Sequence, residues 1–395
     1  MPNVFITPSI IAKEAIRLFE NMCRMAKLVN TGYSEEFHKV GDTITIRLPV
    51  IGQTVDGPDI TGQIKDIEEK STTFKLNYHK TAPIEVSVTD LTLKIEQFSE
   101  RYLRPHMIKL VDDVDMALTG LYPDVYNAVG TAGVTPSKFA HLGASGKLLD
   151  KLAVPKDERR LVLDPDANWA MADDLKGLYA EGIVRPAVER GYLGRVAGHE
   201  LYESQNIRNH TKGVATGTPL VNGASQTGAS LITNGWTNST TGILKKGDVF
   251  TITGVNSVNK INKQNTGELQ QFVATADVDS GASTGPATIP ISPEIILTGA
   301  YQNVTALPAH QAPLTVTGSH AANLAFHKYA FGLATAPIEL PPYLPAAQKA
   351  RVTHNNITMT VIGDFQVLAY STIVRIDILF GTKVLDAGLA CRLLG

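Results

Sequence analysis

The chain has 395 residues, a formal net charge of −2 and 43% apolar residues, so it can bury one or two substantial cores. The balanced charge argues against a dedicated DNA-binding protein, because phosphate affinity comes mainly from clustered Lys and Arg. Two cysteines provide no disulfide framework. We find neither a signal peptide nor an apolar run of the roughly 20 residues that span a bilayer, and we expect a protein made in a reducing cytoplasm.

The first predicted element is an amphipathic helix. Thr7-Pro8 is typical of an N-cap followed by proline in the first turn. Apolar residues, among them Ile11 and Phe19, then follow helical spacing to about Leu28. This apolar face needs a partner surface, and two interpretations stay open: a helix packed on its own domain, or an arm laid on a neighbouring subunit.

Alternation of apolar and polar residues predicts three strands next, at 41–48, 73–79 and 84–89. Between the first two, residues 50–70 are rich in Gly, Asp and Lys and follow no sustained period. We therefore expect a long hairpin-like excursion with a charged tip, which is mobile or held by neighbours because it has little core of its own.

From about Phe98 the apolar period changes to 3.6, which predicts the longest helix of the chain, with Pro105 in a first turn or at a kink. The predicted helices cover 98–130, 135–152 and about 171–179, and short strands are predicted at 160–163 and 195–202.

The composition changes at His210. No arginine occurs between Arg208 and Arg351, and Gly, Thr, Ser and Asn dominate residues 211–313. Segments 249–253, 270–275 and 288–291 are predicted strands separated by turns. A strand-only block of roughly 100 residues has the size of an independent domain, so we predict an inserted β-barrel or sandwich. After it we predict a helix at 321–333 and strands at 357–361 and 373–380.

Each candidate catalytic or metal-binding motif fails on spacing or on missing partners. Residues 143–147 (GASGK) resemble a phosphate loop only superficially, because His141 and Leu148 stand where the motif needs Gly and a hydroxyl residue; we predict a surface helix. His320 and His327 could share a helical face, but no carboxylate or Cys nearby completes a metal site.

The acidic groups also have simple structural explanations. Asp112, Asp113 and Asp115 follow Lys109 and Arg104 at helical spacing, which predicts a solvated, charge-compensated helix face. Asp277 and Asp279 lack the later bidentate Glu of a calcium loop and predict a turn. We therefore expect no catalytic, cofactor-binding or metal site, and no enzyme.

Several segments resemble the coat proteins of P22-type tailed bacteriophages, in the same order along the chain. They are 86–91 (VSVTDL), 98–105 (FSERYLRP), 121–130 (LYPDVYNAVG), 159–165 (RRLVLDP), 191–204 (GYLGRVAG running into LYES), 246–255 (KGDVFTITGV) with 270–273 (QQFV), and 375–381 (RIDILFG). The resemblance covers most of the chain.

The resemblance implies an α+β, HK97-like capsid fold with an inserted all-β domain. The implied parts are an N-arm at 1–40, an E-loop with flanking strands at 41–90, a peripheral domain with its spine helix at 91–134 and closing strands at 351–395, an axial domain at 135–209 and 314–350, and the insertion at 210–313.

It also implies a major capsid protein that assembles as hexamers and pentamers into an icosahedral shell. The shell would enclose double-stranded DNA without sequence-specific binding, with the help of a scaffolding protein and with a portal protein at one vertex. A decoration protein is a further candidate partner; no membrane and no cofactor is implied. Assembly would take place in the cytoplasm of the host bacterium, and the final location would be the virion.

Contacts between subunits are predicted at the charged E-loop tip and on the apolar face of the N-arm helix. The candidates are Asp56, Asp59, Lys65, Glu68, Glu69, Lys70, Ile11 and Phe19. For each charged residue, a solvated hairpin tip is the alternative interpretation.

Two other functions remain open at this stage. An encapsulin-like compartment shares the fold but encloses protein cargo, and a carbohydrate-active enzyme could use the Thr/Gly-rich insertion as a binding module. The enzyme would need a pair of carboxylates in a cleft, for which the sequence offers no obvious candidate.

Overall fold

The computed structural model describes residues 7–34, 36–37, 43–48, 50, 52, 69–87, 98–175, 194–340, 342–345, 348–366 and 371–395. The chain forms two compact units. The first contains residues 1–46, 71–118 and 331–383, and the second contains residues 47–70, 119–330 and 384–395.

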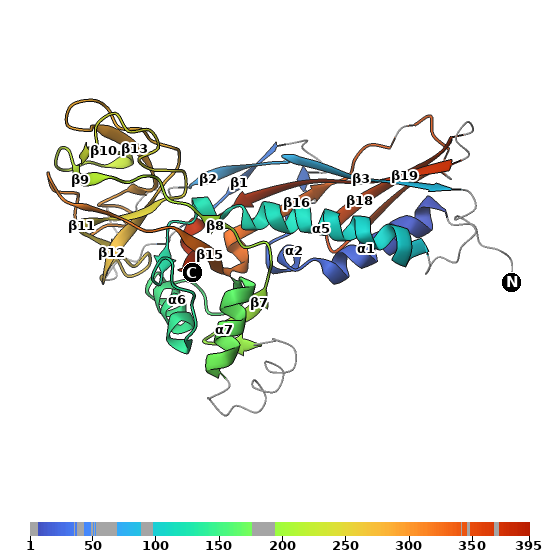
Figure 1. Ribbon diagram of the computed structural model, residues 1–395, viewed down its shortest axis with the longest axis horizontal. Helices are drawn as coiled ribbons and strands as arrows, with labels where there is room; N and C mark the ends of the chain where they lie inside the picture. Colours follow the sequence, from blue (N-terminus) through green and yellow to red (C-terminus); the bar gives the residue numbers. More distant parts are fainter. Residues whose placement is uncertain are drawn as a thin grey trace, which may run out of the picture. The chain divides into compact units, whose positions relative to one another are not determined.

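The first unit is built on an antiparallel sheet with helices laid along it (Figure 1). Its strands are β3 (Tyr78–Ser87), β16 (Phe331–Ala336), β17 (Lys349–His354), β18 (Ile357–Gln366) and β19 (Ser371–Val384), and β1 (Thr43–Arg47) pairs with β2 (Ser71–Lys75). The long strand β19 is central: it pairs with β18, β3 and β16.

The helices of this unit are α1 (Pro8–Met22), α2 (Met25–Leu28) and α5 (Arg104–Thr119), and α5 follows a π-helical turn, η2 (Ser99–Leu103). Helix α1 packs on β17 and β18 through its apolar face, as the 3.6-residue period predicts. Met107, Leu110 and Val114 form the buried stripe of α5.

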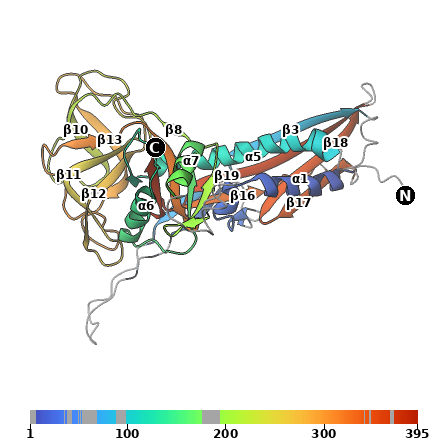
Figure 2. The same ribbon diagram turned by 60° about the horizontal axis from the view of Figure 1, so that its bottom comes forward.

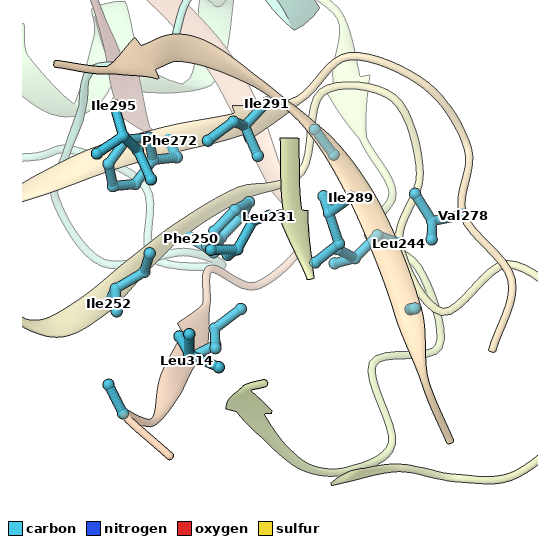
Figure 3. Close-up of a cluster of buried hydrophobic side chains, with 14 of the residues drawn as sticks. Leu231, Leu244, Phe250, Ile252, Phe272, Val278, Ile289, Ile291, Ile295 and Leu314 are labelled. Atoms are coloured by element: carbon cyan, nitrogen blue, oxygen red, sulfur yellow. The ribbon is translucent and has the colours of Figure 1, made fainter. Parts of the chain in front are cut away.

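The second unit contains a closed six-stranded antiparallel barrel. Its strands are β9 (Gly217–Val221), β10 (Gly228–Trp236), β11 (Val249–Val258), β12 (Asn265–Ala274), β13 (Ala287–Ile295) and β14 (Leu314–Val316), in the order β14-β11-β12-β13-β10-β9. An antiparallel bridge between Leu220 and Pro313 brings the two ends of this order together. Alternation places Phe250 and Ile252 inside, and they pack with Phe272, Leu231 and Leu314 in the barrel's own core (Figure 3).

A mixed sheet forms the rest of the second unit. Its strands are β4 (Ala128–Val129), β5 (Arg159–Leu163), β6 (Arg195–Val196), β7 (His199–Glu203), β15 (His320–His327) and β20 (Ala390–Leu394), in the order β4-β20-β15-β5-β7-β6, and β8 (Asn209–His210) also pairs with β15. Helices α6 (Phe139–Lys151) and α7 (Pro165–Leu175) share a core with β5, β15 and β20 (Figure 2).

Several predicted helices need correction. The first, predicted to continue to about Leu28, is interrupted at Cys23 and Arg24 and forms α1 and α2, and the helix predicted at about 171–179 begins at Pro165.

Residues 321–333 are strand rather than helix: they belong to β15, the turn η5 (Lys328–Ala330) and the start of β16. Almost every residue of β15 is buried, so its continuous apolar run has no polar face that distinguishes a buried strand from a helix. Helix α5 ends at Thr119 rather than near Gly130, and α6 begins at Phe139 rather than at Thr135.

The early end of α5 has a local cause. Gly120 follows the last helical residue, and Pro123 has no N–H to continue the α-helical hydrogen bonds. The chain instead makes a short 3-10 turn, η3 (Tyr122–Asp124), before β4. Further strands missed by the sequence patterns are β4, β8, β9, β10, β14, β16, β17 and β20.

Candidate assembly surfaces and the anchor of the inserted barrel

The two apolar contact candidates, Ile11 and Phe19, lie in the core of the chain itself. Their relative exposures are 1% and 0%, and the helix that carries them packs on β17 and β18. This corrects the expectation that these side chains meet a neighbouring subunit. Of the two interpretations of the N-terminal helix, packing on its own domain is the one that the structure shows.

Two of the six charged candidates lie within the described residues. The carboxylate of Glu69 is 3.2 Å from Nη1 of Arg47, and Nζ of Lys70 lies 4.6 Å from the centroid of the Tyr301 ring. Both side chains therefore have partners within the subunit. Asp56, Asp59, Lys65 and Glu68 lie outside the described residues, and their contacts stay predictions.

The acidic group on α5 divides into two environments. Asp112 and Asp113 lie 3.3 and 3.1 Å from Nζ of Lys109, which confirms the charge-compensated face. For Asp115 that prediction is wrong, because this residue is buried. Its carboxylate accepts hydrogen bonds from Sγ of Cys23 at 3.2 Å and from the N–H of Met25 at 3.2 Å.

The buried Asp115 therefore holds the start of α2. Burial raises the pKa of Asp115, while the hydrogen bonds from Cys23 and the Arg24 and Met25 amides act in the opposite direction. Burial also raises the pKa of the Cys23 thiol.

The candidate phosphate-loop, histidine and calcium-loop motifs lie in ordinary secondary structure and turns. Residues 143–147 lie within α6, and Ser145 and Gly146 are buried there, which is consistent with a helix and not a phosphate loop. His320 and His327 lie on a strand rather than on a helix face. Asp277 accepts the N–H of Lys246 and Asp279 that of Gly242. Among the described residues, no group of three His, Cys, Asp or Glu side chains is placed to hold a metal ion.

No helix in the described part of the chain is long and apolar enough to cross a membrane. A pocket of about 300 Å³ lies between β4, α6 and strands β11 and β12 of the barrel. The charged residue in its lining, Glu268, is 2.6 Å from Nζ of Lys151 and 3.0 Å from Nζ of Lys147. This carboxylate is thus engaged in holding the barrel against α6.

A buried arginine is the centre of the contact between the barrel and the mixed sheet. Arg392 lies on β20 with 0% exposure. Its guanidinium donates to the carbonyl of Gly247 at 2.8 Å and to that of Pro123 at 3.1 Å, and it lies 5.3 Å from the centroid of the Tyr122 ring. Burial lowers the pKa of Arg392 to about 10, so the group remains charged at neutral pH.

Gly247 is required at this contact. Its φ is +97°, which favours glycine, and an added Cβ would lie 2.9 Å from Cβ of Pro123. The backbone of the barrel thus approaches the η3 turn as closely as it can while its carbonyl accepts from Arg392.

An acid and two histidines lie beside Arg392. Nε2 of His210 is 2.8 Å from Oδ1 of Asp248, and both side chains are buried. The second carboxylate oxygen of Asp248 accepts the N–H of Gly213 at 2.9 Å and that of Lys245 at 2.7 Å. This one carboxylate therefore connects the segment that enters the barrel with the turn before β11.

His320 completes the group. Its ring centroid is 5.2 Å from that of His210, and its Nδ1 is 2.8 Å from the carbonyl of Gly318, which can only accept. Burial lowers the pKa of His320 to about 4, so the ring is neutral at neutral pH. Its buried Nε2 has no hydrogen-bond partner in the described part of the chain.

A glutamine side chain provides a second connection between the barrel and the mixed sheet. Oε1 of Gln271 accepts the N–H of Ala128 at 2.6 Å, and its Nε2 donates to the carbonyl of the same residue at 2.7 Å. The amide therefore pairs with edge strand β4 as a neighbouring strand would. Further bonds run from Asn259 to the carbonyl of Lys151 and from Lys246 to Asp124.

The sequence patterns did not identify this anchor. Its one local signal is the charge of Arg392 within the otherwise apolar strand ACRLL. His210, Asp248 and Gln271 are spread over the chain, and only the tertiary fold brings them to one interface.

Comparisons with known proteins agree with the resemblance. A family model described as "P22 coat protein - gene protein 5" matches residues 5–391. A major capsid protein of Acyrthosiphon pisum secondary endosymbiont phage 1 is 23% identical over an alignment of 347 residues, and the match covers 81% of this chain and 81% of that protein.

Among solved structures, a chain of Mycobacterium phage Che8 is 14% identical with a TM-score of 0.48, over 94% of this chain and 90% of that one. The capsid of cyanophage P-SCSP1u is 11% identical with a TM-score of 0.45, over 92% and 84%. The match of the family model to nearly the whole chain decides the assignment: the protein belongs to the P22 coat protein family and is a phage major capsid protein, with a fold of the α+β class.

Proposed function

We propose that the protein assembles as hexamers and pentamers into an icosahedral shell that encloses the double-stranded DNA of the phage. The observation that carries the proposal is the family match over residues 5–391. Shells of this kind form because many weak contacts between identical subunits add up in a closed symmetric assembly. The role is mechanical, and we propose no enzymatic activity, since the family is one of structural capsid proteins.

We propose the following correspondence of parts. The first unit, with β17, β18, β19 and spine helix α5, is the peripheral domain; the mixed sheet with α6 and α7 is the axial domain; and the barrel is the insertion within 210–313. Residues 41–90 provide the E-loop, and residues 1–40 the N-arm segment, whose helix α1 packs on the peripheral sheet.

The proposed partners are other copies of the chain, a scaffolding protein during assembly and a portal protein at one vertex. A decoration protein on the inserted domain is a further candidate. Assembly takes place in the host cytoplasm, and the mature protein resides in the virion. The charged E-loop residues Asp56, Asp59, Lys65 and Glu68, with Glu69 and Lys70, would contact adjacent subunits.

Co-expression with the scaffolding protein of the same phage tests the proposal. We expect closed particles of uniform diameter in negative-stain electron micrographs, with coat protein as their main component. A coat protein that stays monomeric under these conditions would contradict the proposal.

The E-loop contacts need a separate test. Reversing the charges of Asp56, Asp59 and Glu68 to Lys should prevent closed shells while the subunit keeps its circular dichroism spectrum. Glu339→Lys, a change at an exposed residue of another segment, is the control and should still give shells. Normal particles from the triple variant would exclude these residues as necessary contacts.

A further inference from the structure

A row of basic side chains follows the exposed side of α1 and α2. The exposed charged residues are Lys13 and Arg17 on α1, Arg24 at the N-cap of α2, and Lys27 on α2. Lys13 and Arg17 lie four residues apart and share one face of α1. The extended residue Cys23 separates this pair from Arg24 and Lys27.

The two carboxylates of α1 do not neutralise this row completely. Glu14 lies 2.6 Å from Arg17 and also accepts from Oγ of Ser99 at 2.8 Å. Glu20 is engaged by Nδ2 of Asn355 at 2.6 Å and lies 3.3 Å from Nε2 of His354. Both carboxylates are only partly exposed, so the outward side of α1 and α2 presents positive charge.

Helix α5 lies beside α1 and continues the basic surface (Figures 1 and 2). Oγ of Ser99 in η2, which leads into α5, donates to Glu14 on α1, and the N–H of Met25 on α2 donates to Asp115 on α5. The first turns add exposed Arg101 and Arg104, against one exposed carboxylate, Glu100.

Further along α5 the charges balance. Lys109 lies near Asp112 and Asp113, and Lys80 is 3.5 Å from Asp113. The basic surface therefore comprises Lys13, Arg17, Lys27, Arg101 and Arg104. It is a local excess, because the whole chain has a net charge of −2.

The composition of this surface favours a polyanion over a protein partner. Stable protein interfaces need a buried apolar centre. In the described residues, α1 and α2 expose no large apolar side chain, and α5 exposes one, Ile108, a helical turn after Arg104. A group of Lys and Arg side chains around one isolated apolar residue instead matches the phosphates of a nucleic acid, which are bound by charge and without sequence recognition.

We propose that the exposed side of α1, α2 and the start of α5 contacts the phosphate backbone of the enclosed double-stranded DNA. This inference rests on the proposed function, because it assumes that the shell contains DNA. It implies that this helical side of the first unit faces the interior of the shell.

Salt-dependent binding to a duplex tests the inference. The full-length soluble subunit is titrated against a fluorescent 30-base-pair duplex between 50 and 200 mM NaCl. Each lost phosphate contact should reduce the slope of log K against log salt by about 0.9. Lys13→Gln/Arg17→Gln/Lys27→Gln should therefore lower the slope by about 2 to 3, with the same result for two unrelated duplex sequences.

Two control variants show whether the position of the charges matters and whether the charges themselves are needed. Lys156→Gln/Arg195→Gln/Lys245→Gln removes the same residue types from exposed positions of the second unit and should keep the wild-type slope. Lys13→Arg/Arg17→Lys/Lys27→Arg retains the charges and should also keep it. Equal thermal unfolding of all variants shows that they are folded.

Several outcomes would overturn the inference. These are a wild-type subunit that does not bind the duplex at 50 mM NaCl, an unchanged slope in the first triple variant, or an equal loss in the second-unit control. Loss of co-assembly with the scaffolding protein at an unchanged slope would assign the surface to a protein partner instead. Failure of the proposed function is distinguishable, since it is seen as the absence of wild-type shells in electron micrographs.

Discussion

Arg392 combines a high cost of burial with several compensating contacts. A guanidinium loses its hydration when it is fully buried, and this loss is recovered only if its donors find acceptors. Gly247 and Pro123 provide two carbonyls, and the face of Tyr122 lies close to the charge. Because one side chain binds the barrel and the η3 turn together, its removal affects both.

We expect Arg392→Met to lower the free energy of unfolding by about 3 to 5 kcal/mol, because two buried carbonyls lose their donor. Arg392→Lys should be intermediate, since an ammonium cannot reproduce the planar fork. Urea unfolding followed by circular dichroism measures the change. Arg195→Met, at an exposed position, is the control and should stay within about 0.5 kcal/mol of wild type.

Two buried histidines predict a loss of stability in acid. Burial lowers the pKa of His199 to about 4, and nearby Arg159 acts in the same direction; the pKa of His320 is also about 4. The ordinary pKa of histidine is 6.5, so below this pH the two histidines bind protons in the unfolded chain while they stay neutral in the folded protein. The contribution of each neutral histidine to the free energy of unfolding is therefore fully present above pH 6.5 and is lost as the pH falls toward 4.

The expected loss is at most about 3 kcal/mol for each histidine. Urea unfolding at pH 7, 6 and 5 measures it, and His199→Gln should show a weaker fall than wild type over this range. His310→Gln, at an exposed position, should show the same fall as wild type. Identical pH profiles for wild type and His199→Gln would contradict the role of His199.

At the scale of elements, the barrel has two kinds of stabilising contact. Its interior is a closed apolar core that includes Phe250, Phe272 and Leu231, and its exterior is attached to the mixed sheet by hydrogen bonds and ion pairs. The first kind should stabilise the barrel as an independent domain, whereas the second should determine how firmly it is attached.

We expect a fragment of residues 211–317 to fold alone. Its circular dichroism spectrum should be of the β type, and it should unfold cooperatively, because the core cluster lies entirely within it. Phe272→Ala should lower the stability of the fragment by about 3 to 5 kcal/mol. A disordered spectrum for the unmutated fragment would contradict the independence of the barrel.

Gln271→Leu should loosen the barrel from edge strand β4 without unfolding it. The change removes both hydrogen bonds to Ala128 and leaves its N–H and carbonyl without these partners, at an expected cost of about 1 to 3 kcal/mol. Hydrogen exchange should become faster at Ala128 but not at Phe250 inside the barrel. Gln302→Leu, elsewhere in the second unit, is the control, and unchanged exchange at Ala128 in Gln271→Leu would refute the strand-like role of this amide.

For the whole molecule, the packing of α1 changes what a truncation should do. A helix that only contacts neighbours could be removed without loss of the subunit fold. Because Ile11 and Phe19 are buried on β17 and β18, deleting residues 1–30 should instead expose that sheet and destabilise the subunit. Each large apolar side chain lost contributes about 1.5 to 3 kcal/mol.

Denaturant unfolding and light scattering of the truncated chain test this expectation. We expect a lower unfolding midpoint or aggregation before assembly can be assessed. Lys13→Gln, a change on the exposed side of the same helix, should leave the midpoint unchanged. A truncated subunit with the wild-type midpoint would restore the interpretation of residues 1–30 as an arm for neighbours only.

The sequence by itself determined the elements whose apolar pattern has a clear period. The amphipathic α1 and α5, the alternating β18 and β19, and the Thr/Gly-rich inserted β domain were all predicted, because one solvated face makes the period visible. The family could also be recognised from ordered segments. Charge compensation of Asp112 and Asp113 followed from the nearby Lys109 through local spacing.

The tertiary structure alone decided the features that depend on contacts between distant residues. Strand β15 was predicted as a helix because both of its faces are buried and its pattern has no polar period. Asp115 is buried where it accepts from the start of α2, and two nitrogens of the Arg392 guanidinium donate to carbonyls that lie far away in the sequence. Local patterns report which side of an element meets water, whereas the partners of a buried polar group are set by the fold as a whole.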